Sequence, residues 1–241
     1  VSVRLLEGST GAALFRETFT WPADDVSSIG TELASQVAEA LREQIGGELR
    51  VREARATAPN SAAWLQMARA ERYLKDASEA VLAGDVDAIV TALDAAESEL
   101  VSAQESAPDW AEPLVLRSRV AYEWYILLGG NLDELRETLD LAVAHADAAL
   151  LLDPDNPAAL EWRGTALYRR WLMRFDEGAA ADNVLSRAKA DLERSRVLDS
   201  GRASAASTLS HLYYQVDDWV GAVIAAREAY EEDAFLDVAD G

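Results

Sequence analysis

The stretch Asp153-Pro154-Asp155-Asn156 places three oxygen-bearing side chains within four residues. Carboxylate and amide oxygens at this spacing open the calcium-binding loop of an EF-hand. That loop also needs a glycine at its sixth position and a glutamate at its twelfth, and neither follows here. Asp, Asn and Pro are equally typical of turns and of helix N-caps. The stretch therefore predicts a joint between two helices, and no metal site.

Histidine and cysteine offer no other candidate for metal or covalent chemistry. The chain has no cysteine, and its two histidines, His145 and His211, each stand alone on a helical pattern. Metal ligation needs several ligands at suitable spacing, and Asp217 and Asp218 come after the expected end of the helix that carries His211. No phosphate-binding glycine loop, GxSxG or HExxH motif occurs. We predict no metal, no cofactor and no catalytic residue.

Acidic residues are so numerous that a carboxylate pair could be drawn almost anywhere. Asp and Glu total 43 against 22 Lys and Arg, for a formal net charge of −21. Solvated helix faces and helix caps account for most such residues, and a hydrolase with carboxylates lining a helical groove stays as an alternative. The charge opposes binding to nucleic acid or to an anionic membrane. No apolar run reaches the roughly 18 residues of a membrane-spanning helix.

Aromatic and arginine residues gather in YRRWLMRF (168–175), a combination suited to binding a protein. The apolar stripe of this helix consists of Tyr168, Trp171, Leu172 and Phe175. The arginines beside the stripe are Arg169, Arg170 and Arg174. In one interpretation the stripe faces the core and the arginines pair with neighbouring acids. In the other, the patch binds an acidic peptide or a second copy of the protein. The related YEWYILLG (122–129) has Glu123 where Arg169 stands, so the arginines are the variable part.

The arginines belong to a basic band in an acidic chain. Residues 157–202 hold nine basic and seven acidic side chains, whereas residues 61–156 hold six and nineteen. Residues 203–241 return to one basic and eight acidic side chains. A self-assembly module, with the band at 168–196 of one chain against the acidic part of another, is a further alternative.

An internal repeat shows which elements must position these side chains. Shifting the sequence by 46 residues brings Pro108 onto Pro154 and Tyr122 onto Tyr168. Further small or apolar residues align at the same offset, namely Leu114 with Leu160, Ser118 with Gly164 and Ala142 with Ala188. The apolar spacing in each unit is helical. Small residues at fixed positions allow two helices to cross closely.

These positions resemble the tetratricopeptide repeat, a helix–turn–helix unit with small residues at its eighth, twentieth and twenty-seventh positions. They are Ser118, Ala142 and Ala149, then Gly164, Ala188 and Ser195, then Ser210, Ala222 and Ala229, with a weaker set at Ala68, Ala96 and Ala103. The resemblance implies a mainly α fold, an α-α superhelix of about four units near 61–110, 111–156, 157–202 and 203–236. The first three units span 50, 46 and 46 residues instead of 34. We expect longer helices or long loops in their middles.

The N-terminal residues predict a short β-hairpin followed by a helix. Val1, Val3 and Leu5 alternate, a turn follows at Glu7–Gly11, and 14–21 is rich in aromatic and β-branched residues. Pro22, Asp24 and Asp25 then precede a helical pattern. This order, with Thr10-Gly11 and Leu14-Phe15, resembles the end of a TolB amino-terminal-like domain. Residues 1–56 would be the remnant of that α/β domain, and 57–241 the helical repeats.

Together the two resemblances imply a non-enzymatic scaffold or regulatory module that binds a protein or peptide. We expect the chain to be a fragment of a larger bacterial signalling protein, with a kinase or cyclase domain upstream, in the cytoplasm or the periplasm. First helices of such repeats usually line the binding face. The candidate residues for a partner are Trp64, Gln66, Arg69, Arg117, Tyr122, Arg163, Tyr168, Arg169, Arg170, Trp171, Arg174 and His211.

Overall fold

The computed structural model of the protein describes residues 2–6, 13–18, 58–127 and 131–232. The chain divides into two compact units, Val1–Thr57 and Ala58–Gly241. In the first unit, strand β1 (Ser2–Leu6) pairs antiparallel with β2 (Ala13–Thr18), in a register that sets Arg4 opposite Arg16. The strands lie where the sequence predicted a hairpin. The helix predicted after Pro22 lies outside the described residues.

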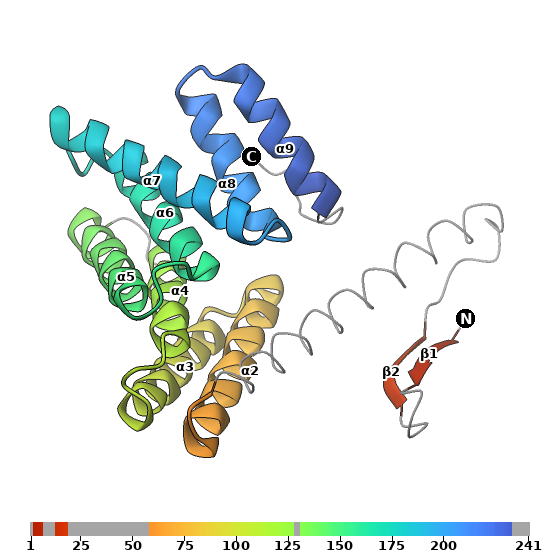
Figure 1. The fold of residues 1–241 in the computed structure, drawn as a ribbon. Coiled ribbons are helices and arrows are strands. Elements are labelled where there is room, and N and C mark those ends of the chain that lie inside the picture. Colours follow the sequence, from red (N-terminus) through yellow and green to blue (C-terminus); the bar gives the residue numbers. More distant parts are fainter. Residues whose placement is uncertain (1, 7–12, 19–57, 128–130, 233–241) are drawn as a thin grey trace. The chain divides into compact units, whose positions relative to one another are not determined.

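The described part of the second unit is built from eight α-helices, as the mainly α fold class predicted (Figure 1). They are α2 (Ser61–Ala83), α3 (Val86–Ser106), α4 (Glu112–Leu127), α5 (Leu132–Leu152), α6 (Pro157–Leu172), α7 (Ala179–Leu198), α8 (Ala203–Gln215) and α9 (Trp219–Glu232). Each first helix packs most extensively on the helix that follows it, so α2–α3, α4–α5, α6–α7 and α8–α9 are pairs. Stacked in chain order, these pairs form an α-α superhelix.

Side-chain caps fix where the helices begin. The Asn60 side chain accepts a hydrogen bond from the Ala63 N–H at 2.9 Å, and Asn156 accepts one from the Ala159 N–H at 3.0 Å. Asp153 is the C-cap of α5, and Pro157 follows Asn156 as the first residue of α6. The Asn156 amide also donates to the Asp153 carboxylate at 3.2 Å. The predicted joint at 153–156 is therefore confirmed, with Asp153 and Asn156 acting as caps.

The small residues of the repeat are the points at which paired helices touch. The Ser118 hydroxyl donates to the backbone carbonyl of Ala142 at 2.8 Å, and the Ser210 hydroxyl donates to that of Ala222 at 3.0 Å. At the equivalent position, a Cβ on Gly164 would lie 2.7 Å from Cγ of Leu192. Such close approach leaves no room for a larger side chain, which is why these positions hold Ser or Gly.

The weaker set at Ala68 needs a correction. Ala96 is fully buried, but Ala68 is only partly buried. The buried stripe of α2 consists of Ala63, Met67, Ala70, Leu74, Ala77 and Ala80. Successive residues of a helix are rotated by about 100°, so Ala68 lies beside this stripe and not on it.

The extra residues of the long units lengthen helices more than loops. Helices α2 and α3 contain 23 and 21 residues and are joined by Gly84 and Asp85 alone. Gly84 ends α2 with a φ of 69°, a left-handed conformation that favours glycine. The second helices α5 and α7 contain 21 and 20 residues, whereas α8 and α9 of the short last unit contain 13 and 14.

Candidate partner-binding surface

The first helices of successive pairs lie against one another. Besides its partner α7, α6 packs on α5 of the preceding pair, and it also contacts the first helices α4 and α8 (Figure 1). Within the described residues, successive second helices contact one another less than these first helices do, which places the first helices on the inner side of the curve. Side chains near the C-terminal ends of α4 and α6 can therefore be reached together from this face.

Arg117 and Arg163, which are equivalent in the repeat, are bound within the chain. Arg163 donates to both oxygens of Asp191 on α7 at 2.7 Å each, and to Asp147 on α5 at 2.7 Å. Arg117 donates to Glu97 at 2.8 Å and to Gln104 at 2.6 Å, both on α3. Each arginine thus joins its own pair of helices to the preceding pair, and its charge is neutralised there.

Other arginines of the basic band also meet acids of the same chain. Arg170 pairs with Asp140 and, at 3.0 Å, with Asp176. Further ion pairs in the band join Arg194 to Asp155, Arg196 to Glu228 and Arg202 to Glu161. Arg174, by contrast, is exposed just after the end of α6. Of the three arginines beside the aromatic stripe, the pairing interpretation therefore holds for Arg170. The ion pairs of the band also leave fewer unpaired positive charges for the self-assembly alternative.

The aromatic stripe of α6 and its counterpart on α4 face the interior. Tyr122 and Tyr168 are buried, and Tyr168 stacks on Trp171 with ring centroids 6.3 Å apart. The Tyr122 ring lies 5.7 Å from the rings of both Tyr125 and Trp162. Of these contacts, the one between Tyr122 on α4 and Trp162 on α6 joins consecutive repeats and stabilises their packing. The core-facing interpretation therefore holds for Tyr122 and Tyr168, whereas Trp171 and Phe175 are only partly buried.

Arg169 differs from the paired arginines. Its Nε donates to the Tyr122 hydroxyl at 3.0 Å, and its guanidinium lies 5.9 Å from the Tyr168 ring centroid. Within the described residues, no carboxylate lies at ion-pairing distance from this guanidinium. Burial raises the pKa of Tyr122, an effect that the positive charge of Arg169 partly offsets, so Tyr122 accepts the bond as a neutral phenol.

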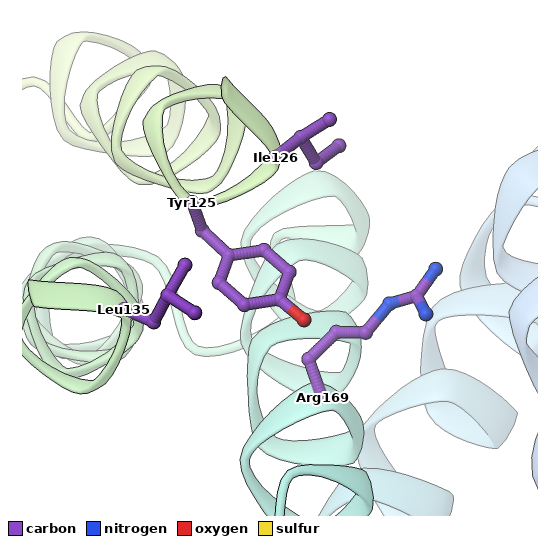
Figure 2. A pocket seen from close by; sticks show the side chains of 4 residues that line it. All are labelled: Tyr125, Ile126, Leu135 and Arg169. Atoms are coloured by element: carbon purple, nitrogen blue, oxygen red, sulfur yellow. The ribbon is translucent and has the colours of Figure 1, made fainter. Parts of the chain in front are cut away.

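Arg169 lines an open hollow of about 380 Å³ together with Tyr125, Ile126 and Leu135 (Figure 2). The Tyr125 ring crosses the hollow with its hydroxyl toward the Arg169 side chain, and Leu135 closes the side formed by α5. Ile126 is 61% exposed, although it is a large apolar residue. A cationic group beside exposed apolar surface is typical of sites that bind protein.

His211 on α8 extends this surface on the other side of α6. Its ring is exposed, and its pKa is lowered by partial desolvation and by the positive charge of Arg169. Tyr122, Tyr168, Arg169 and His211, all candidates from the sequence, thus lie close together on three first helices. Their role in binding stays a prediction.

The candidates on α2 lie elsewhere. Arg69 forms a 3.6 Å ion pair with Glu99 on α3, and the Gln66 side-chain amide donates a hydrogen bond to the Ser106 hydroxyl at 3.0 Å. Trp64 is partly buried on the same helix. The structure does not bring these three residues to the hollow beside Arg169. Sequence reasoning also missed Tyr125, Ile126 and Leu135, although the three-residue spacing of Tyr122 and Tyr125 was a readable signal that both share a helix face.

The hydrolase alternative depended on acids with raised pKa clustered in the groove. Burial raises the pKa of Glu112, and the nearby charge of Asp153 adds to the effect. Glu112 begins α4, about 15 Å along the helix axis from Tyr122, at the rise of 1.5 Å per residue.

Among the described residues, no group of three His, Asp or Glu side chains could hold a metal ion. In the same part of the chain, no helix is both long and apolar enough to span a membrane.

Comparisons with known proteins give similarity of structure but not of sequence. No protein-family model matches the sequence, and no curated protein matches it significantly. TTC0263, a thermophilic TPR protein of Thermus thermophilus, is 15% identical at a TM-score of 0.48, over 70% of this chain and 95% of that one. MamA (MSR-1 C2) is 14% identical at 0.40, over 69% and 97%. YrrB, a TPR protein with an unusual peptide-binding site, is 17% identical at 0.35, over 69% and 88%.

Proposed function

We propose that residues 58–232 act as a protein-interaction scaffold that binds an extended segment of a partner protein across α4, α6 and α8. The observation that carries the proposal is the hollow beside Arg169, where a guanidinium lies next to the exposed Ile126 and the Tyr125 ring. The bound arginines Arg117 and Arg163 hold the helix pairs around it. The helix pairs that carry this surface are therefore joined to their neighbours by ion pairs.

The position of the hollow favours a peptide over a small molecule. It is open rather than enclosed, and its lining residues come from three different helices of two successive repeats. Small-molecule sites usually bury most of their ligand in a cleft. An extended chain can instead cross several first helices and place one side chain in the hollow.

A randomised array of 12-residue peptides, each acetylated and amidated, tests this function. We expect the purified chain to retain a subset of peptides, the Ile126→Glu variant to lose that subset, and Leu151→Glu to retain it. Leu151 is the matched control because it is 84% exposed on α5 and lies outside the hollow. Retention of the same peptides by Ile126→Glu would place binding elsewhere, and an array on which nothing binds would contradict the function.

The N-terminal resemblance supports a further proposal about context. If residues 1–56 are the end of a TolB amino-terminal-like domain, the scaffold is the regulatory module of a larger bacterial signalling protein. Sequencing the complete reading frame tests this point, since a kinase, cyclase or DNA-binding domain should precede residue 1. A reading frame with none of these would overturn it.

A further inference from the structure

We propose that the hollow beside Arg169 binds one side-chain carboxylate, from an Asp or Glu of the partner, with an aliphatic side chain of the partner lying next to it on Tyr125 and Ile126. This inference rests on the proposed function and adds to it the chemistry of the segment that is recognised. Four observations carry it: the hydrogen bonds of Arg169, the charges around it, the apolar lining and the charge of the whole chain.

The guanidinium of Arg169 has donors left for a ligand. Arginine carries five N–H groups, of which the Nε–H goes to the Tyr122 hydroxyl at 3.0 Å. Figure 2 shows the guanidinium beyond the Tyr125 ring, with its terminal nitrogens directed away from Leu135. Arg163 on the same helix is an example of a fully used guanidinium edge, because it donates hydrogen bonds to both oxygens of Asp191 at 2.7 Å. A ligand carboxylate would make the equivalent two-oxygen contact with Arg169.

Among the residues that the structure describes, no acid balances the charge of Arg169. Its hydrogen-bond partner Tyr122 is a neutral phenol, because burial raises the pKa of that residue. Glu123, the acid next to Tyr122 on α4, is paired with Arg119 at 3.4 Å. The charge of Arg169 also helps to lower the pKa of His211, so His211 is neutral near pH 7. A partly buried cation without a counter-ion favours a ligand that supplies one.

The apolar lining of the hollow indicates which partner residue lies next to the bound carboxylate. Tyr125 and Leu135 present apolar surface, and Ile126 is 61% exposed beside them. Covering an exposed isoleucine with an aliphatic side chain removes apolar area from water, which is favourable. The recognised element is therefore an acidic residue next to Leu, Ile, Val or Met, rather than an acidic residue alone.

The charge of the whole chain limits the ligand to one negative group. The net charge of −21 repels polyanions, and the neighbouring Arg170 is already paired with Asp140 and Asp176. A single guanidinium can balance a carboxylate but not a doubly charged phosphate or a run of acids. The favoured segment therefore carries one acid in an apolar setting.

Peptides retained by the wild-type chain on the array test this inference in two ways. We expect them to be enriched in one Asp or Glu adjacent to an aliphatic residue. For one such peptide, Asp→Asn or Glu→Gln should weaken binding to the wild-type chain at least about tenfold, the size expected for hydrogen bonds to a charged group. The same change in the peptide should weaken binding to the Arg169→Gln variant less than about twofold.

The Arg72→Gln variant is the matched control. Arg72 is an exposed arginine on α2, outside the hollow and not among the candidate residues, so its removal changes the net charge equally and should leave the tenfold ratio intact. If Arg169→Gln does not fold, the peptide substitution on the wild-type chain still decides the question. Retained peptides without acid enrichment, or a peptide substitution without effect, would overturn this inference and leave the scaffold function standing. An array on which nothing binds overturns both.

Discussion

The Nε of Arg169 on α6 donates a hydrogen bond to the buried hydroxyl of Tyr122 on α4, at 3.0 Å. The two residues stand in successive repeats, and Tyr122 holds in its own repeat the position that Tyr168 holds in the next. The bond therefore joins two first helices and also orients the guanidinium beside the hollow. A single contact links the stability of the stack to the shape of the proposed binding surface.

Replacing Tyr122 with phenylalanine removes this bond and leaves the aromatic packing in place. We expect the free energy of unfolding to fall by about 1–2 kcal/mol, since the partly buried Nε–H of Arg169 loses its acceptor. Urea denaturation monitored by circular dichroism measures the change. Tyr214→Phe is the control, because Tyr214 is 59% exposed on α8. Equal stability of Tyr122→Phe and the wild type would show that the bond does not hold the helices together.

Gly164 should not tolerate even one added carbon. Gly→Ala within a helix ordinarily stabilises a protein by about 0.5–1 kcal/mol. Here the new Cβ would lie 2.7 Å from Cγ of Leu192 and 3.0 Å from the Ala188 carbonyl oxygen. We expect Gly164→Ala to destabilise the chain by about 1–3 kcal/mol, as overpacking does.

Gly201→Ala serves as the control for that substitution. A Cβ at Gly201 meets only the Asp199 carboxylate oxygen, at an ordinary 3.5 Å. Thermal unfolding of both variants measures the difference. We expect a lower melting temperature for Gly164→Ala and a nearly unchanged one for Gly201→Ala. A Gly164→Ala protein as stable as the wild type would contradict the close helix crossing.

The ion pairs of Arg163 and Arg194 should differ in their effect on stability. Arg163 and its partner Asp191 have side chains that are 18% and 10% exposed, whereas Arg194 and Asp155 are 54% and 64% exposed. We expect Arg163→Ala to cost about 2–4 kcal/mol, because it leaves Asp191 buried without its partner. Arg194→Ala should cost about 0–1 kcal/mol. Comparable losses in urea denaturation would contradict the structural role assigned to Arg163.

His145 should make the protein sensitive to mild acid. Burial lowers the pKa of His145 to about 4, helped by the positive charge of Arg117, against an ordinary value of 6.5. Between these values the unfolded chain binds a proton that the folded chain does not. The stability associated with His145 is therefore complete above pH 6.5 and is lost as the pH falls toward 4.

His145→Gln removes that proton-binding group. Because the ring is partly exposed, we expect the loss of unfolding free energy between pH 7 and pH 4.5 to be only about 1–2 kcal/mol smaller in the variant than in the wild type. Urea denaturation at the two pH values measures this difference. Identical losses would mean that His145 is protonated equally in both states.

The sequence predicted the elements of this fold better than their contacts. The offset of 46 residues placed Ser118, Gly164 and Ser210 at helix crossings, because only small residues fit where backbones approach closely. The same reasoning placed Ala68 at a helix crossing, although Ala68 is only partly buried. On an alanine-rich helix, an assignment of the small residue that is wrong by one or two positions cannot be recognised from the sequence pattern.

The candidate surface was harder to predict. All arginines of the basic band look alike in the sequence, yet Arg163 and Arg170 pair with acids on other helices, whereas Arg169 has no acidic partner in the described part of the chain. That difference depends on which acidic residues of α5 and α7 face α6, and such contacts between helices are not encoded in the spacing along one helix. Leu135 lines the hollow from α5, the next helix of the chain, and no local sequence pattern indicated this contact.

Isoleucine methyl NMR with a peptide retained by the wild-type chain tests the central claim most directly. The chain contains five isoleucines, of which Ile126 borders the hollow, Ile89 is buried between α2 and α3, and Ile224 is exposed on α9. We predict that the peptide shifts the Ile126 δ1 methyl signal in proportion to saturation and leaves those of Ile89 and Ile224 in place. A shifted Ile224 signal with an unmoved Ile126 signal would contradict binding across the first helices.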